Sequence, residues 1–173
     1  YGSSLLAVAR ALGAELRELP DWNCCGSTPY TAAGELVSLC PAGRNLALAE
    51  KAGLDLVTPC SSCYVVLNRA NMRVQGSPGL KGRLNEALSA GVLSYRGTVR
   101  VHHVLDVFAN DIGPEAVKAK VQRSLAGLKV APYYGCQVVR PEPSFDDPEA
   151  PQTLDRLIES LGAGYIGDLT GGF

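Results

Sequence analysis

Apolar residues recur at helical spacing along several segments of the chain. The first such segment, residues 3–14, predicts a helix that closes at Gly13, because glycine readily adopts the left-handed conformation that ends helices. Residues 31–52 predict a longer helix that ends at Gly53 and that Pro41 could break. Further helices are predicted over residues 62–72, 80–90, 104–110 and 114–126, and strands over residues 54–58, 99–101 and 129–134. This alternation predicts an α/β fold with a largely parallel sheet.

A short internal sequence repeat suggests that the fold is duplicated. Leu12-Gly13-Ala14 recurs as Leu161-Gly162-Ala163, each time after an amphipathic helical run. At the same spacing Cys24 maps onto Phe173, and Cys136 maps onto a position before Tyr1. We therefore expect two related α/β repeats, with residues 1–127 forming a nearly complete first repeat and residues 128–173 the start of a truncated second one.

Composition narrows the classes of partner. The chain has 46% hydrophobic residues, enough for a core, and 16 basic against 17 acidic residues. A net charge of -1 leaves no excess positive charge to bind nucleic acid or an anionic membrane surface. Charged residues interrupt every apolar run before the ~18 residues that a membrane-spanning helix needs. We expect a soluble, cytoplasmic protein.

Six cysteines occur, at positions 24, 25, 40, 60, 63 and 136. An extracellular disulfide framework is one interpretation, but disulfides mainly stabilise chains too short to build a core. Reduced thiols that bind metal or carry redox chemistry are the preferred interpretation.

The hexapeptide Asp21-Trp22-Asn23-Cys24-Cys25-Gly26 is the most unusual motif. Adjacent thiolates on an extended backbone point in different directions, so a cluster of several irons accommodates both more easily than one small ion does. Gly26 permits a turn or a close approach to an inorganic group. Taken alone, the pair could also be two buried cysteines that only pack.

A second motif, Pro59-Cys60-Ser61-Ser62-Cys63-Tyr64, follows a predicted strand. Its spacing lets two sulfurs face one site from the first turn of a helix, whose positive end favours thiolate. Alone, this spacing fits zinc, a redox dithiol or an iron–sulfur cluster; the Cys-Cys-Gly motif favours the cluster.

Together these motifs resemble the cysteine-rich CCG-domain family, whose best-known member is the catalytic B subunit of heterodisulfide reductase. Two later stretches fit the same family: Tyr133-Tyr134-Gly135-Cys136-Gln137-Val138-Val139-Arg140-Pro141 and Phe145-Asp146-Asp147-Pro148-Glu149. The resemblance spans nearly the whole chain.

The resemblance implies that each repeat supplies a lone cysteine, a Cys-Cys-Gly and a Cys-x-x-Cys to a non-cubane [4Fe–4S] cluster. It makes Cys24, Cys25, Cys60 and Cys63 ligands of the first cluster, with the catalytic role exerted through that cluster and with Gly26 beside it. The remaining ligand of that cluster would precede Tyr1. Cys136 would be the lone cysteine of the second cluster.

The implied activity is reduction of the mixed disulfide of coenzyme M and coenzyme B by an oxidoreductase. The implied partners are an iron–sulfur electron donor like the C subunit of heterodisulfide reductase and a flavoprotein like its A subunit. Relatives serve in sulfur oxidation, in lactate or glycolate oxidation and in a variant succinate dehydrogenase, so an electron-transfer subunit remains an alternative. A structural zinc module and a thioredoxin-like dithiol enzyme using Cys60 and Cys63 are two others.

The remaining candidate residues are expected to have structural rather than catalytic or ligand roles. We expect Cys40 to be a small buried hydrophobe and His102-His103 to form a cap or core contact rather than ligate metal. Trp22 is expected to pack beside the cysteine loop and shield it from water, and Arg140 to form a surface ion pair.

Overall fold

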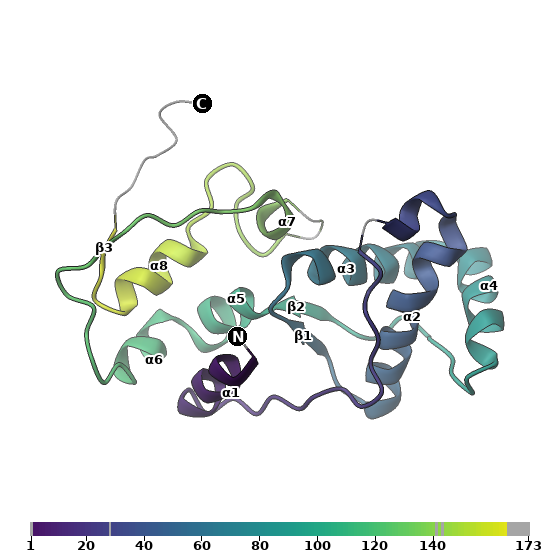
Figure 1. The fold of residues 1–173 in the computed structure, drawn as a ribbon, viewed down its shortest axis with the longest axis horizontal. Helices are drawn as coiled ribbons and strands as arrows, with labels where there is room; N and C mark the ends of the chain where they lie inside the picture. Colours follow the sequence, from purple (N-terminus) through teal and green to yellow (C-terminus); the bar gives the residue numbers. More distant parts are fainter. Residues whose placement is uncertain (1, 28, 141, 143, 166–173) are drawn as a thin grey trace. The chain divides into compact units, whose positions relative to one another are not determined.

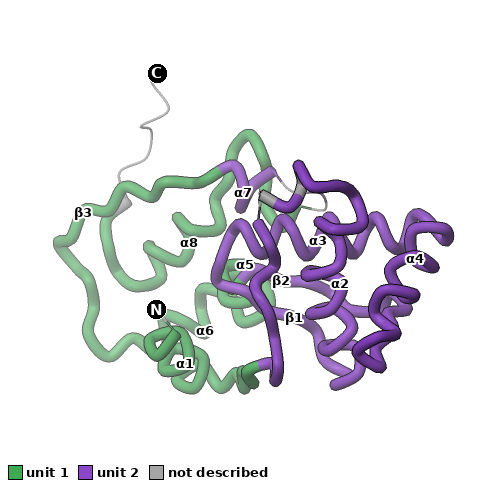
Figure 2. The backbone as a smooth tube through the Cα atoms, turned by 45° about the vertical axis from the view of Figure 1, so that its right-hand side comes forward, with its two compact units in different colours: residues 1–18, 104–135, 144–173 green, residues 19–103, 136–143 purple. Residues whose placement is uncertain are grey.

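The computed structural model describes residues 2–27, 29–140, 142 and 144–165. The chain divides into two compact units, coloured separately in Figure 2. Unit 1 comprises residues 1–18, 104–135 and 144–173, and unit 2 comprises residues 19–103 and 136–143. All six cysteines lie in unit 2.

Three helices and a small parallel sheet form the centre of unit 2 (Figure 1). Its elements are η1 (Pro29–Ala32), α2 (Glu35–Ala52), β1 (Leu56–Thr58), α3 (Ser61–Gly76), α4 (Pro78–Ser89), β2 (Val101–His103) and α7 (Cys136–Val139). Helices α2, α3 and α4 pack against one another, and α3 also packs on both strands and on α7. Strand β1 pairs with β2 in parallel, with Leu56 opposite Val101 and Thr58 opposite His103.

Close packing explains why α2 is continuous although Pro41 lies inside it. Gly43 lies against α4, where an added Cβ would lie 2.8 Å from Leu84 Cδ1. Ala42, Leu46 and Leu84 are fully buried around this crossing. This burial outweighs the one backbone hydrogen bond that proline removes, so the predicted break at Pro41 does not occur.

Unit 1 is also mostly helical. It contains α1 (Gly2–Ala11), α5 (Val104–Asp106), the π-helical segment η2 (Val107–Ile112), α6 (Pro114–Ala119), β3 (Lys129–Val130), α8 (Thr153–Ser160) and β4 (Gly164–Tyr165). Helix α8 packs on α6 and η2, and β3 pairs with β4 in parallel. The Asp146 carboxylate accepts hydrogen bonds from the N–H groups of Gln152 and Thr153 and so satisfies the start of α8.

The predicted parallel pairing is confirmed, but the structure is mostly helical, and among the residues that it describes each unit has a single two-stranded sheet. Gly13 and Gly162 each come shortly after the end of a helix, and their φ angles are positive, at 78° and 85°. The structure does not, however, show two repeats. Phe173 lies outside the described residues. The boundary between residues 127 and 128 therefore stays a prediction. Within the described part of the chain, no helix has the length and apolar character required to span a bilayer.

Candidate cysteine site

The loop that carries Cys24 and Cys25 is attached to helix α2 through two asparagines. The backbone N–H of Asn23 donates to Asn45 Oδ1 at 3.0 Å, and Asn45 Nδ2 donates to the Asn23 carbonyl at 2.6 Å. Asn23 Nδ2 in turn donates to the carbonyls of Cys24 and Pro41, at 2.8 and 3.0 Å. Asn45 is only 7% exposed, so its two bonds to the Asn23 main chain are partly buried. The residue before the cysteine pair is thus fixed on both its main chain and its side chain.

Arg44, the neighbour of Asn45 on α2, holds the preceding turn. Its guanidinium donates to the Asn23 side chain and to the carbonyl of Asp21, and it forms an ion pair with the Asp21 carboxylate. Asp21 has a φ of 58°, a left-handed conformation that non-glycine residues adopt at some cost. The two contacts that Arg44 makes with Asp21, one to its carbonyl and one to its carboxylate, hold Asp21 in this conformation.

The two adjacent cysteines differ in environment. Cys25 is 5% exposed, whereas Cys24 lies at the surface. The chain then turns at Gly26, whose φ is 87° and where an added Cβ would lie 2.5 Å from Cδ2 of Tyr30. The motif predicts this turn, and glycine is the residue that fits it; the neighbour that an added Cβ would meet is the Tyr30 ring. Trp22 is 57% exposed, so the prediction that it shields the loop from water is wrong.

The second motif lies where β1 passes into α3. Cys60 occupies the N-cap position of α3, and its N–H donates to Thr58 Oγ1 at 3.2 Å. The N–H of Cys63 donates toward the Cys60 sulfur and lowers the pKa of that thiol, with a smaller contribution from the N–H of Ser62; burial opposes the shift. The start of a helix therefore favours a thiolate at Cys60, as the motif predicts.

The two cysteine-bearing loops meet. Burial, hydrogen bonding with Cys25 and hydrogen bonding with Cys60 together raise the pKa of the Cys63 thiol. Cys63 therefore interacts with the buried member of the Cys-Cys pair and with its own motif partner. Beside them, the hydroxyls of Ser27 and Ser62 lie 3.0 Å apart and link the two loops directly.

The donor set fits an iron–sulfur group. Three of the side chains that converge here, Cys25, Cys60 and Cys63, carry sulfur, the ligand on which such clusters rely. None of the six cysteines, all of which lie in the described part of the chain, forms a disulfide. Among the described residues, no three His, Cys, Asp or Glu side chains are spaced to hold a single metal ion. Instead, Cys63 interacts with Cys25 and with Cys60.

The other predicted residues occupy different surroundings. Cys136 is exposed and begins α7, the short helix that packs on α3. Cys40 is half-buried in α2, and burial raises the pKa of its thiol. His103 is buried at the end of β2, with its ring edge-on to Tyr64 at 5.7 Å between centroids, the core contact that the sequence predicts.

Four residues of the site carried no prediction of their own: Ser27, Arg44, Asn45 and Ser62. A signal exists for Asn45, because it lies among Ala42, Leu46 and Ala49 on the buried side of α2. A polar residue at such a position must find a buried partner. The serine pair has no comparable signal, since it forms only when the two loops meet.

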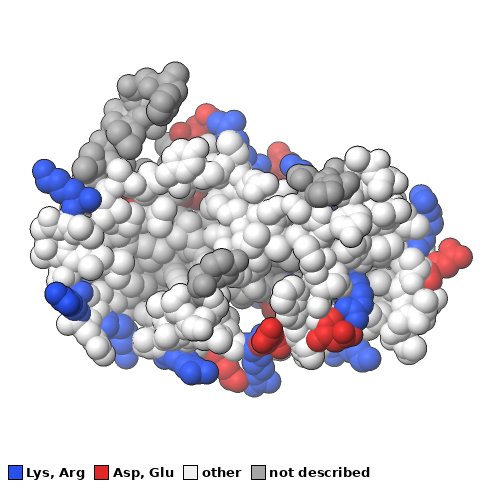
Figure 3. Space-filling model, in the orientation of Figure 1, with Lys and Arg blue, Asp and Glu red and all other residues white. Residues whose placement is uncertain are grey.

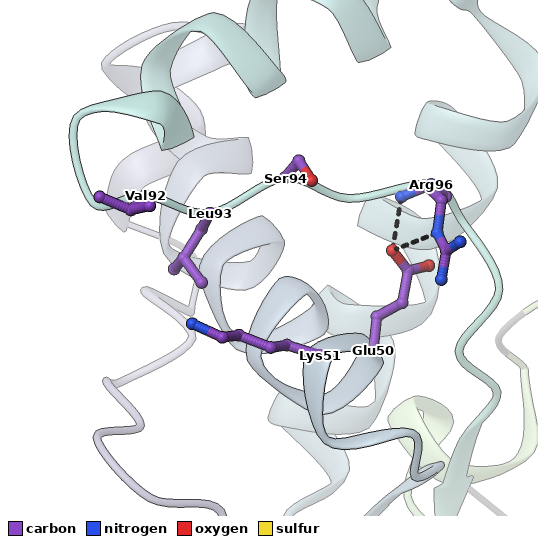
Figure 4. A pocket seen from close by; sticks show the side chains of 6 residues that line it. All are labelled: Glu50, Lys51, Val92, Leu93, Ser94 and Arg96. Carbon is purple, nitrogen blue, oxygen red and sulfur yellow. Dashed lines mark hydrogen bonds and ion pairs between the residues drawn. The ribbon is translucent and has the colours of Figure 1, made fainter.

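A separate hollow lies at the end of α2, away from the cysteine motifs in sequence (Figure 4). Glu50, Lys51, Val92, Leu93, Ser94 and Arg96 line it. The Glu50 carboxylate accepts a hydrogen bond from the N–H of Arg96 at 2.8 Å and forms an ion pair with its side chain at 3.4 Å. On the face drawn in Figure 3, the basic and acidic side chains of the described residues are interspersed.

Comparison with known proteins places these motifs in context. Residues 1–68 match the family model described as a cysteine-rich domain, CCG. The chain is 38% identical over 165 residues to the 8-methylmenaquinol:fumarate reductase membrane anchor subunit of Wolinella succinogenes, covering 94% of this chain and 57% of that one. It is 34% identical over 149 residues to the B subunit of the ferredoxin/F(420)H(2)-dependent CoB-CoM heterodisulfide reductase of Methanosarcina acetivorans, covering 84% and 49%.

The chain thus spans about half the length of the curated relatives that it matches. Among solved structures, a hypothetical protein from Helicobacter pylori has the same fold, with a TM-score of 0.68 at 16% identity over 96% of this chain and 29% of that one.

Proposed function

Because the chain carries a cysteine-rich CCG domain and is related to subunits of heterodisulfide and fumarate reductases, we propose that it is an iron–sulfur subunit of a disulfide-reducing complex. In this proposal Cys24, Cys25, Cys60 and Cys63 hold a [4Fe–4S] cluster of the non-cubane type. Cys136 is proposed to be the lone cysteine of a second site. Two sites of this kind would supply the two electrons that one disulfide requires.

The observation that carries the proposal is that the two cysteine-bearing loops meet: the hydroxyls of Ser27 and Ser62 lie 3.0 Å apart, and Cys63 lies within interaction range of both Cys25 and Cys60. Cys25 and Cys63 are far apart in sequence and belong to different motifs, so only the fold brings their sulfurs together. A site with sulfur donors from two loops is what a multi-iron group needs.

The chain's own residues have separable roles. The start of α3 stabilises negative charge on Cys60, and Asn45 fixes the backbone that precedes Cys24. Gly26 removes the side chain that would otherwise collide with Tyr30 at the turn. When bound, the cluster supplies electrons one at a time to the substrate disulfide.

The proposed reaction breaks one sulfur–sulfur bond and forms two thiols, and it consumes two electrons and two protons. The relative from Methanosarcina acetivorans is named for CoB-CoM heterodisulfide, and this mixed disulfide is our proposed substrate. The electrons are proposed to come from an iron–sulfur protein like the C subunit of heterodisulfide reductase, in a complex with a flavoprotein like its A subunit. This assignment makes the protein an oxidoreductase acting on a sulfur group.

A second candidate is an electron-transfer subunit of a complex that does not reduce disulfides. The 38% identity to a fumarate reductase subunit favours it, because that relative is named for a quinol and fumarate. The cysteine site would then pass electrons to another protein of the complex, as in the lactate oxidase, glycolate oxidase or succinate dehydrogenase complexes considered from sequence.

An anaerobic assay separates these functions. The purified protein, reduced with a viologen dye, is mixed with CoM-S-S-CoB, and the new thiols are counted. The disulfide reductase proposal expects two thiols per two electrons, and loss of this activity in Cys24→Ser as well as in Cys60→Ser. Activity retained in Cys24→Ser would instead indicate a dithiol enzyme using Cys60 and Cys63. A cluster-loaded protein that leaves the disulfide intact would indicate the electron-transfer role.

A further inference from the structure

Two serines form a direct side-chain link between the two cysteine-bearing loops. The hydroxyl of Ser27, two residues after Cys25, lies 3.0 Å from the hydroxyl of Ser62, which stands between Cys60 and Cys63. Both side chains are half-buried. This bond joins the two cysteine-bearing loops at points one or two residues from Cys25, Cys60 and Cys63 in sequence.

The backbone at Ser27 is strained, and glycine would relieve the strain. Its φ is 47°, in the left-handed region that residues with a Cβ adopt at an energetic cost. Gly26, immediately before it, also has a positive φ. Such strain persists where the surrounding structure enforces it, and it is common at functional sites. In this conformation the hydroxyl of Ser27 lies within hydrogen-bond distance of the hydroxyl of Ser62.

Counting hydrogens gives the pair a free donor. Two hydroxyls carry two hydrogens, and their mutual bond uses one of them, whichever serine donates it. The hydroxyl that accepts this bond keeps its own hydrogen. Ser27 lies two residues from Cys25, and Ser62 lies next to Cys63 and two residues from Cys60. Thiolate sulfurs accept hydrogen bonds.

We propose that the Ser27–Ser62 pair donates a hydrogen bond to sulfur at this site and thereby raises the reduction potential of the bound iron–sulfur group. Hydrogen bonds to sulfur stabilise the more negative, reduced form, and they are a main determinant of such potentials. The two serines are positioning residues that act through sulfur. This inference rests on the proposed cluster but not on the identity of its substrate.

The test is a redox titration of the purified, cluster-loaded protein, monitored by electron paramagnetic resonance. We expect Ser27→Ala and Ser62→Ala each to lower the midpoint potential while iron content stays at the wild-type level. The double variant should shift the potential by less than the sum of the single shifts, because the two hydroxyls act as one donor. Ser62→Thr keeps a hydroxyl and should restore the wild-type potential.

Ser61→Ala is the matched control, because Ser61 belongs to the same Cys-x-x-Cys motif but not to the hydroxyl pair. It should leave the potential unchanged. Unchanged potentials in fully loaded Ser27→Ala and Ser62→Ala would overturn the inference. Loss of iron from both variants, with Ser62→Thr loaded normally, would also overturn it and make the pair a structural clasp. A wild-type protein that binds no iron would refute the cluster itself, and the inference with it.

Discussion

Asn23 and Asn45 exchange two hydrogen bonds, so that the main chain immediately before the Cys-Cys pair is paired with a buried side chain of helix α2. The position of the cysteine loop therefore depends on Asn45, a helix residue that lies outside both cysteine motifs in the sequence. The relationship explains how a loop without regular secondary structure can present two sulfurs in a fixed place.

Asn45→Ala should therefore lower the amount of iron that the protein binds, beyond what its loss of folding stability alone would cause. Removing both bonds and leaving the Asn23 groups unsatisfied should lower the free energy of unfolding by about 1 to 3 kcal/mol. It should also reduce the iron bound per chain, measured after anaerobic reconstitution.

Asn85 provides a matched control for this variant. It makes the same reciprocal pair with the main chain of Tyr95, at 3.1 and 2.8 Å, but on helix α4. Asn85→Ala should lose comparable stability in urea denaturation and keep its iron. If Asn45→Ala loaded as fully as Asn85→Ala, the anchoring role of Asn45 would be refuted.

Gly26→Ala tests the turn after the cysteine pair. The substitution adds a Cβ at a φ of 87° and within 2.5 Å of the Tyr30 ring, so we expect a loss of about 1 to 3 kcal/mol in unfolding free energy. Adding Tyr30→Ala should remove the collision but not the backbone strain, and should recover only part of the loss. Gly82→Ala, in α4 with open space around its Cβ, should be neutral or stabilising.

The carboxylate of Glu50 should make the stability of unit 2 dependent on pH. Burial alone would raise its pKa, but hydrogen bonds from Thr98 and Arg96 outweigh burial and lower the pKa. Because the folded pKa lies below the unfolded one, this stabilisation is complete above roughly pH 4.3, the ordinary pKa of Glu, and is lost as the pH falls through the folded pKa. Glu50→Gln should flatten the fall in urea midpoint below that pH. The same change at the exposed Glu86 should leave the fall as steep as in the wild type.

Most helices of unit 2 were predictable, because their apolar periodicity agrees with their final packing. The ends of the strands were less predictable, because other main-chain and side-chain groups bind the backbone groups there. The N–H of Leu54 bonds to Ala49 at the end of α2, so β1 begins only at Leu56. Asn71 binds the Val99 carbonyl and Asp55 binds the Arg100 N–H, so β2 begins at Val101 rather than Val99. Such long-range hydrogen bonds leave no local pattern in the sequence.

In the candidate site too, local features could be predicted from the sequence and long-range contacts could not. The spacing of Cys60 and Cys63 and the glycine after Cys25 are local features, and the sequence identifies them. The exposure of Trp22 and the contact of Ser27 with Ser62 depend on how two distant loops meet. The assignment of Cys24, Cys25, Cys60, Cys63 and Cys136 as ligands stays a prediction until metal is measured.

That measurement is the iron and acid-labile sulfide content of the protein purified without oxygen. The account predicts a brown protein with at least about four irons and four sulfides per chain, a content that Cys25→Ser should abolish and Cys40→Ser should leave unchanged. A colourless wild-type protein that carries one zinc, or that keeps its full iron content in Cys25→Ser, would contradict the account.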